Sequence, residues 1–198
     1  MLMEKIIAER FAEAKTILEL TSNDPEVLKA AAGVSRAIID TYNNGGKVFI
    51  AGNGGSAADA QHIAAELVSR FYRERKALAA ESLTVNTSNL TAIANDYDFS
   101  AVFSRQLEAN ARKGDIFWGI STSGNSKNIL AAIQTARNIG MKIVGFTGKN
   151  GGKMAEPGTC DLIVKIPSGD TPRIQENHIL IAHIICEMVE TALFGQDA

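Results

Sequence analysis

Three polar side chains recur at four-residue intervals in the segment that follows residue 60. His62, Glu66 and Arg70 stand at i, i+4 and i+8, which places them in one row along a helix. A histidine and a glutamate at this spacing can share one metal ion. The same row also fits a solvated helix face with an i,i+4 salt bridge. The spacing alone leaves both interpretations open.

A turn of glycines and small polar residues comes directly before this row. The stretch GNGGS at residues 52–56 separates a predicted strand that begins at Val48 from a predicted helix. The start of a helix attracts anions because it carries free N–H groups and the positive end of the helix dipole. Glycines allow a close approach to the backbone, and Ser56 adds a hydroxyl. The turn therefore fits a compact phosphate site, and equally a tight turn that Ser56 caps.

Two nucleotide-binding motifs are not supported. The letters G-x-G-x-x-A at residues 52–57 satisfy the loosest dinucleotide fingerprint, but that fold needs an acidic residue at the tip of the second strand. Here the predicted second strand ends in TVNT at residues 84–87, and Glu81 lies inside it. The segment 148–153 has the wrong glycine spacing for a Walker P-loop and lacks the Ser or Thr after its lysine.

A second loop is rich in hydroxyl groups. The stretch STSGNS at residues 121–126 follows a predicted strand and has four hydroxyls in six residues, more than one N-cap requires. Ligands of open parallel sheets bind beyond the carboxyl ends of the strands, so we expect the two loops to converge on one phosphate. Neither loop has a cationic side chain. This favours a phosphomonoester of a small metabolite over a triphosphate, which normally requires lysine and magnesium.

Polar residues also interrupt the apolar final helix that is predicted to begin near Arg173. Gln175 and His183 are eight residues apart, about 80° round the helix axis, so one broad face carries both. His178 lies about 140° from His183 by the same geometry. We expect His178 to be a core residue, and the apolar pattern by itself gives the same interpretation for His183.

The remaining sequence supplies the elements that must hold these groups. Two helical patterns come first, and Asp24 is placed to cap the second, at residues 25–42. Five apolar segments then alternate with helical ones, which predicts a parallel sheet that is covered on both faces. The predicted strands cover residues 47–52, 77–85, 115–121, 142–148 and 161–167, and the helices between and after them begin near Ser56, Ser88, Ser126 and Arg173. We expect the final helix and the amphipathic N-terminal helices to pack partly against another subunit.

Composition and charge narrow the classes of function. The chain has 198 residues, of which 45% are hydrophobic, enough for one domain with a substantial core. The formal net charge of −2 argues against a large nucleic-acid or anionic-membrane surface. The N-terminus lacks the apolar core of a signal peptide, and we expect no segment that spans a bilayer. Cys160 and Cys186 show neither metal-ligand nor disulfide spacing, so we expect buried reduced thiols in a cytoplasmic protein.

Several motifs, in order along the chain, resemble those of the sugar isomerase (SIS) domain family, and most closely its bacterial phosphoheptose isomerases. They occupy residues 52–56, 95–97, 103–106, 120–126, 147–154 and 173–176. The resemblance runs from the N-terminal helices through the final helix. It implies a three-layer α-β-α sandwich, with a mostly parallel five-stranded sheet plus N-terminal helices. It also implies one SIS domain over residues 1–198, whose N-terminal helical arm, about residues 1–44, contributes to oligomerisation.

The resemblance further implies the reaction and the site. The phosphoheptose isomerases convert sedoheptulose 7-phosphate into D-glycero-D-manno-heptose 7-phosphate through an enediol, the first step toward nucleotide-activated heptose for lipopolysaccharide, as homotetramers with sites at subunit interfaces. His62, Glu66, Gln175 and His183 match the family's zinc positions, and Glu66 and His183 match its catalytic acid–base pair. The positions that match substrate-binding residues are Asn53, Gly54, Gly55, Ser56, Glu66, Arg70, Asn95, Asp96, Ser121, Thr122, Ser123, Ser126 and Gln175. Some relatives have an aspartate where this chain has Pro172, and the nearby Asp170 is offset.

Two other functions use the same scaffold. Relatives that bind the bacterial replication initiator keep the glycine turn but lack the histidine and glutamate of the helix row. This chain retains His62, Glu66 and His183, which favours an enzyme. An isomerase for a shorter phosphosugar would use the same chemistry in a smaller pocket.

Overall fold

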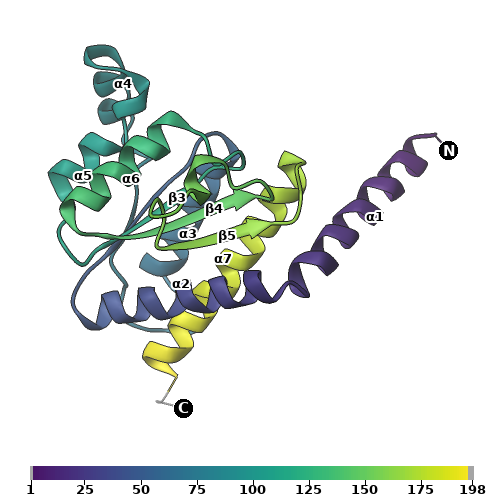
Figure 1. Cartoon of the computed structure of the whole chain (residues 1–198). Helices are drawn as coiled ribbons and strands as arrows, with labels where there is room; N and C mark the ends of the chain where they lie inside the picture. Colours follow the sequence, from purple (N-terminus) through teal and green to yellow (C-terminus); the bar gives the residue numbers. More distant parts are fainter. Residues whose placement is uncertain (1, 196–198) are drawn as a thin grey trace.

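The structure is a computed structural model that describes residues 2–195 (Figure 1). Its α-helices are α1 (Leu2–Ser22), α2 (Pro25–Asn43), α3 (Gly55–Val68), α4 (Thr87–Asp96), α5 (Ser104–Asn110), α6 (Lys127–Ile139) and α7 (Thr171–Phe194). Its strands are β1 (Val48–Ala51), β2 (Ala80–Ser82), β3 (Ile116–Ile120), β4 (Lys142–Gly148) and β5 (Leu162–Ile166). Two short 3-10 helices, η1 (Phe99–Ala101) and η2 (Gly152–Ala155), lie in the connections.

The five strands form one sheet in the order β2-β1-β3-β4-β5, and every neighbouring pair is parallel. The chain runs outward from β1 to β2 and then returns to place β3 on the other side of β1. The strand order therefore reverses between β1 and β3, where Ala51 lies opposite Gly119. In open parallel sheets, ligands bind beyond the carboxyl ends of the strands at such a reversal.

Helices cover both faces of the sheet, which confirms the predicted three-layer sandwich (Figure 1). Residues of α2, α3 and α7 pack on one face with Val48 and Ile50. Residues of α5 and α6 pack on the opposite face with Phe49 and Ala51. Successive strand residues point to opposite faces, so a strand covered on both sides must be apolar throughout. The continuous apolar run of β1 follows from this.

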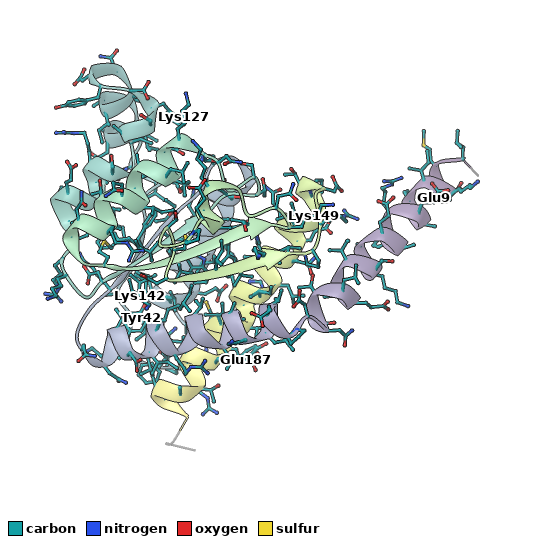
Figure 2. The ribbon with its side chains drawn as sticks, viewed as in Figure 1. Glu9, Tyr42, Lys127, Lys142, Lys149 and Glu187 are labelled. Atoms are coloured by element: carbon teal, nitrogen blue, oxygen red, sulfur yellow. The ribbon has the colours of Figure 1, made fainter. Side chains whose placement is uncertain are left out.

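The two N-terminal helices differ in how they pack. Asp24 caps α2 as predicted, because its Oδ1 accepts hydrogen bonds from the backbone N–H of Glu26 and Val27 at 2.9 and 3.4 Å. The first helix, α1, buries only Thr21 and projects from the sheet as an arm (Figure 1). Figure 2 shows Glu9 near the outer end of this arm, away from the other labelled side chains.

The structure corrects two predictions about the elements. The strand predicted over residues 77–85 is shorter, because β1 has four residues and only Ala80–Ser82 can pair with it at the sheet edge. The seven-residue helix α5 was not predicted, since it is too short to show a clear helical period. Gln106 ties this helix to the end of β2, because its buried Nε2 donates to the carbonyl oxygen of Leu83 at 3.0 Å.

The final helix is longer and more apolar than a typical surface helix. By length and composition alone, α7 could cross a membrane, so the expectation of no such segment was wrong by that measure. Residues such as Ile181, Ile185 and Val189 are buried against the sheet and its neighbouring helices. Core packing therefore accounts for much of its apolar composition. Leu180, Ile184 and Met188 form an exposed stripe on the same helix.

Both cysteines are free thiols. Cys186 is buried, as predicted, whereas Cys160 is only half-buried against Gly145 at the edge of the core. Burial raises the pKa of each thiol to about 12, which keeps both protonated and unreactive at neutral pH.

His178 is a core residue, as predicted, and is 1% exposed. Its Nε2 lies 3.1 Å from the carbonyl oxygen of Thr147, and its Nδ1 has no hydrogen-bond partner. Burial lowers the pKa of this imidazole to about 4, so the ring stays neutral in the folded chain at neutral pH.

We therefore expect His178 to make folding pH-dependent. Below its unfolded pKa of about 6.5, the unfolded chain binds a proton that the folded chain excludes until about pH 4. The stabilisation is complete above pH 6.5 and is lost as the pH falls toward 4. Between pH 7 and pH 5 it should decrease by about 2 kcal/mol. Urea unfolding of wild type and His178→Gln at both pH values measures this difference, and parallel losses in both proteins would contradict it.

Candidate active site

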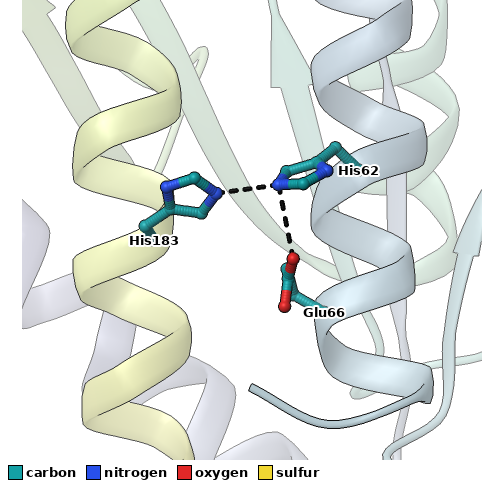
Figure 3. A group of neighbouring side chains, drawn as sticks. All are labelled: His62, Glu66 and His183. Atoms are coloured by element: carbon teal, nitrogen blue, oxygen red, sulfur yellow. Dashed lines mark hydrogen bonds and ion pairs between the residues drawn. The ribbon is translucent and has the colours of Figure 1, made fainter. Parts of the chain in front are cut away.

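Three side chains from two helices meet at one point between α3 and α7 (Figure 3). The Nε2 atoms of His62 and His183 are 2.8 Å apart, and His62 Nε2 lies 3.3 Å from Glu66 Oε1. One ligand atom from each residue lies within 4.8 Å of the others. Glu66 is mostly covered, whereas the imidazole of His62 is half exposed. The structure therefore brings together three of the four residues that were predicted to bind metal.

The chemistry of these three groups fits a cation. An imidazole Nε2 carries either a proton or a lone pair, so the Nε2 of His62 can hydrogen-bond to both neighbours only as a shared donor. A cation between the three groups would instead accept a lone pair from each. Two imidazole nitrogens and one carboxylate oxygen are a donor set that zinc uses in proteins. His62, Glu66 and His183 thus form a possible metal site.

Gln175 lies at the other end of the same helix pair. A Cβ built on Gly55 would lie 2.6 Å from Gln175 Nε2, so this amide occupies the space beside the first turn of α3. Gly55 leaves that space open because it has no side chain. His183 follows eight residues later, about 12 Å along the helix axis. The role of Gln175 as a metal ligand therefore stays a prediction, and its observed position is beside the glycine turn.

The serines of the second loop face one another. Ser121 Oγ lies 2.9 Å from Ser126 Oγ and 3.4 Å from Ser123 Oγ. Ser121 is nearly buried, so its hydroxyl is held in place by these neighbours. Three hydroxyls that face one point can donate to the oxygens of one phosphate.

A neighbouring segment supports this loop from behind. The backbone N–H of Met154 donates to the carbonyl oxygen of Gly124 at 3.1 Å, and Gly148 donates to that of Thr122 at 2.9 Å. Gly124 has φ +66°, and a Cβ there would lie 1.8 Å from the oxygen of Gly151. Only glycine fits this contact. The motif at residues 147–154 therefore shapes the serine loop.

Both predicted phosphate loops flank the reversal in strand order. The glycine turn follows β1, and the serine loop follows β3, which is paired with β1. Ser56 is buried at the start of α3, and α6 begins directly after Ser126. Two helix N-termini, each a favourable place for an anion, thus lie on either side of this point.

Three other predicted substrate residues, Asn95, Asp96 and Arg70, are exposed. Asn95 and Asp96 are exposed at the end of α4, where Asn95 Nδ2 donates to Asp96 Oδ1 at 2.8 Å. Helix α4 buries none of its residues and stands away from the sheet (Figure 1). Arg70 is exposed just beyond α3, 3.9 Å from the Glu74 carboxylate. Their roles in substrate binding stay predictions.

The sequence analysis did not predict a buried ion pair that joins α7 to the segment after α3. Arg75 and Glu190 join at 2.9 Å, and their side chains are 2% and 3% exposed. Glu190 also accepts the backbone N–H of Phe71, Tyr72 and Arg73 at 2.7–2.9 Å. Burial tends to raise the pKa of Glu190, but these three N–H donors and the guanidinium outweigh it and lower the pKa below its ordinary value.

The same pair holds the end of α3. Arg75 Nη2 donates to the carbonyl oxygen of Glu66 at 2.9 Å, and Arg75 Nη1 donates to that of Leu67 at 2.8 Å. Glu190 lies seven residues after His183, so both occupy one side of α7. The pair therefore fixes the turn of α3 that carries Glu66 against the helix that carries His183. The one sequence signal was a glutamate inside an apolar helix.

Asp59 is a second acidic residue that the sequence analysis did not select. It lies one turn before His62 on α3, and its Oδ2 is buried without a hydrogen-bond partner. Burial raises the pKa of Asp59 to about 6, although the nearby His62 acts in the opposite direction. The α3 row therefore carries a carboxyl group that titrates near neutral pH.

Comparison with known proteins gives one family. The profile described as SIS domain matches residues 11–148, more than half of the chain. A phosphoheptose isomerase of Aneurinibacillus thermoaerophilus is 51% identical over 192 residues, which is 97% of this chain and 96% of the relative. A phosphoheptose isomerase of Helicobacter hepaticus is 52% identical over 190 residues, 96% of this chain and 94% of the relative.

Solved structures agree with these matches. The structure of phosphoheptose isomerase GmhA from Neisseria gonorrhoeae has a TM-score of 0.89 and 39% identity, over 96% of this chain and 99% of that chain. A phosphoheptose isomerase structure from Francisella tularensis has a TM-score of 0.91 and 34% identity, over 96% of this chain and 100% of that chain. The chain therefore belongs to the SIS-domain family and, within it, to the phosphoheptose isomerases.

Proposed function

We propose that this phosphosugar isomerase converts sedoheptulose 7-phosphate into D-glycero-D-manno-heptose 7-phosphate by proton transfer through an enediol. The observation that carries the proposal is the placement on α3 of both required parts. The helix begins beside the two loops suited to phosphate, and its next turns present Glu66 and His62 to His183. Relatives about half identical over nearly the whole chain bear the name phosphoheptose isomerase.

The phosphate end of the substrate binds at the reversal in strand order. Ser56 and the three serines of the second loop donate their hydroxyls, and the backbone at Gly54 and Gly55 provides N–H groups at the start of α3. Ser56 and His62 are six residues apart, about 9 Å along the helix axis. A seven-carbon chain has six C–C bonds of about 1.5 Å each, so an extended heptulose phosphate has the length to reach His62.

The carbonyl end of the substrate lies beside a base and an imidazole. A carbon acid next to a carbonyl is weak, so the site must place a base at the carbon and polarise the oxygen. Glu66 takes the proton from the carbon, and His183 performs acid–base work on the opposite side of the substrate. His62, Glu66 and His183 would hold zinc. Gln175, the predicted fourth ligand, lies about 12 Å along α7 from His183 within one chain, so it would reach this ion from a neighbouring subunit. When bound, zinc would polarise and orient the substrate oxygens.

The exposed predicted residues act around the sugar. Asn53 and Thr122 lie near the substrate from the two loops, Arg70 binds sugar hydroxyls, and Asn95 and Asp96 contact the substrate, with Asp96 assisting ring opening. In one chain Asn95 and Asp96 are exposed on α4, which stands away from the sheet (Figure 1), and Arg70 is exposed just beyond α3. We therefore place the complete site at a subunit interface of a homotetramer. The reaction would take place in the cytoplasm, and its product would supply heptose for surface polysaccharide.

Exposed apolar residues support an assembly of this kind. The arm α1 exposes Phe11 and Leu18, and α7 exposes the stripe of Leu180, Ile184 and Met188. Phe11, Leu18 and Leu180 line one groove between the two helices. A contiguous apolar surface of this kind is typical of a protein–protein interface, and a second copy of this chain is the proposed partner.

Light scattering after gel filtration tests the assembly. We expect the wild-type chain to elute as a tetramer, and Leu180→Glu with Ile184→Glu to dissociate it, because burying two carboxylates in an interface is unfavourable. Lys113→Glu, at an exposed position between α5 and β3, serves as a charge control away from both helices. A wild-type monomer with full isomerase activity would contradict an interface site.

A direct assay tests the reaction. Purified protein is incubated with sedoheptulose 7-phosphate, and the aldose product is followed by proton nuclear magnetic resonance, with and without a chelator. Conversion that falls in the chelator and returns with added zinc is expected. A shorter ketose phosphate in the same assay tests the alternative substrate. Binding of the phosphosugar with no conversion in any metal would favour the binding-protein alternative.

Ser121→Ala should weaken phosphate binding. A lost hydrogen bond to a charged group costs about 1.5–3 kcal/mol, so KM for the phosphosugar should rise by about 10- to 100-fold. The value of kcat should change little, since Ser121 lies in the loop and not among the groups that move protons. Ser22→Ala, at the exposed end of α1, provides the control. An unchanged KM would show that this loop does not bind the phosphate.

A further inference from the structure

The side-chain amides of Asn53 and Asn128 form a reciprocal pair. Asn53 Nδ2 donates to Asn128 Oδ1 at 3.0 Å, and Asn128 Nδ2 donates to Asn53 Oδ1 at 2.8 Å. Asn128 is only 4% exposed. A pair of this kind has two hydrogen bonds in a fixed plane, so it restrains both distance and orientation between the two side chains.

The pair joins the two loops that flank the strand reversal. Asn53 belongs to the turn after β1, and Asn128 is the second residue of α6, directly after the serine loop. No strand ladder connects these loops, because each leaves the sheet after its strand ends. Asn53, Ser126 and Asn128 also line one pocket together with residues 98–100. The pair therefore lies at the wall of the site and bridges its two halves.

The hydrogen bonds use half of the hydrogen-bonding capacity of Asn53. Its Oδ1 accepts from Asn128 and one of its two Nδ2 hydrogens is donated to Asn128, so one N–H and one lone pair of Oδ1 remain. Asn128 Oδ1 additionally accepts the backbone N–H of Ile129 at 2.9 Å. That bond satisfies one of the free N–H groups in the first turn of α6 and fixes the Asn128 side chain to its own helix.

We propose that Asn53 and Asn128 are a positioning pair that sets the separation of the two phosphate-binding loops. Asn53 affects phosphate affinity through Asn128. The start of α3 and the serine loop are thereby held at the spacing that lets both contact one phosphate. The inference rests on the proposed function of these loops, and it adds Asn128 as a residue on which substrate affinity depends.

A double-mutant cycle on phosphate affinity tests the pair. Asn53→Ala, Asn128→Ala and the double variant are compared with wild type by calorimetric titration with inorganic phosphate and by kcat and KM for sedoheptulose 7-phosphate. Each single change should raise the Kd of phosphate about tenfold, and the double change should raise it no further. KM should follow the Kd, while kcat changes less than KM.

Two outcomes would contradict the proposed role of this pair. An unchanged phosphate Kd in Asn128→Ala would remove its role, and single effects that multiply in the double variant would show that Asn53 binds ligand independently. Asn128→Ser, which retains a polar side chain but is too short to reach Asn53, repeats the test if the alanine variant is unstable. Thermal unfolding of every variant shows whether the chain is folded.

A matched control and the assay of wild type separate this proposal from the proposed reaction. Asn138→Ala removes an exposed asparagine on the same helix, where it accepts a hydrogen bond from Gln134, and should leave both constants unchanged. If the variants show the expected coupling in phosphate affinity but wild type does not isomerise sedoheptulose 7-phosphate, the proposed reaction fails and the role of the pair stands. If wild type isomerises the sugar and the variants show no coupling, only the proposed role of the pair fails.

Discussion

Glu66→Gln is expected to lower kcat by about 10²- to 10⁴-fold, the usual contribution of a general base. The change preserves the shape of the side chain but removes the basic oxygen that takes the proton from carbon. Glu66 is well placed for this role because its carboxylate is mostly covered, lies 3.3 Å from His62 Nε2, and belongs to a turn whose carbonyl oxygen is bound by Arg75. The measurement is steady-state kinetics with sedoheptulose 7-phosphate.

Two further measurements distinguish loss of the base from loss of substrate or metal binding. The affinity of Glu66→Gln for inorganic phosphate should match that of wild type, because the phosphate loops lie at the start of α3 and Glu66 lies near its end. Zinc content per chain should be measured in both proteins, since the same carboxylate is a predicted ligand. Glu74→Gln alters a nearby exposed carboxylate and should retain full activity. Full kcat in Glu66→Gln would overturn the assignment of the base.

Glu190→Gln is expected to reduce the free energy of unfolding by about 3–5 kcal/mol, the cost of breaking a buried ion pair by removing one partner. The guanidinium of Arg75 would remain buried without its counter-ion, and one oxygen that accepts backbone N–H groups would become an amide. Because the pKa of Glu190 is lowered by folding, its contribution is present above the ordinary pKa and is lost as the pH falls below it. Urea unfolding at pH 7 measures the loss.

The exposed pair of Arg105 and Glu108 provides the control. Its side chains are 44% and 56% exposed, so Glu108→Gln should cost at most about 1 kcal/mol. Replacing Arg75 and Glu190 together by methionine should cost less than Glu190→Gln alone, since no buried charge is then left unpaired. A loss in Glu190→Gln no larger than that of the control would show that the buried pair contributes little to stability.

The local elements of this protein were predictable because their signals are local. The segment 142–148 was predicted as a strand and is β4 with the same bounds, since a strand covered on both faces must be apolar throughout. The cap at Asp24 and the core position of His178 also followed from neighbouring residues alone. The second strand was overestimated, because its length depends on how much of β1 is free to pair with it.

The candidate site was only partly predictable from residue patterns. The row of His62 and Glu66 follows from the helical period, and the two hydroxyl- and glycine-rich loops follow from their composition. The choice of His183 over His178 came from resemblance to a family, because both lie in an apolar helix that would bury either. The pair Asn53–Asn128 gave no recognisable signal, and Arg75–Glu190 gave only a glutamate inside an apolar helix, since their members are 75 and 115 residues apart.

The sequence by itself determined most of the elements, the parallel sheet, the polar row on α3, and the two loops with phosphate chemistry. The tertiary structure decided that His62 meets His183 across 121 residues, that Gln175 lies beside Gly55, and that α4 stands away from the sheet (Figure 1). The physical reason is one of range. Helical and strand periods fix the direction of a side chain about its own axis, whereas the element opposite it depends on strand order and on the packing of the whole core.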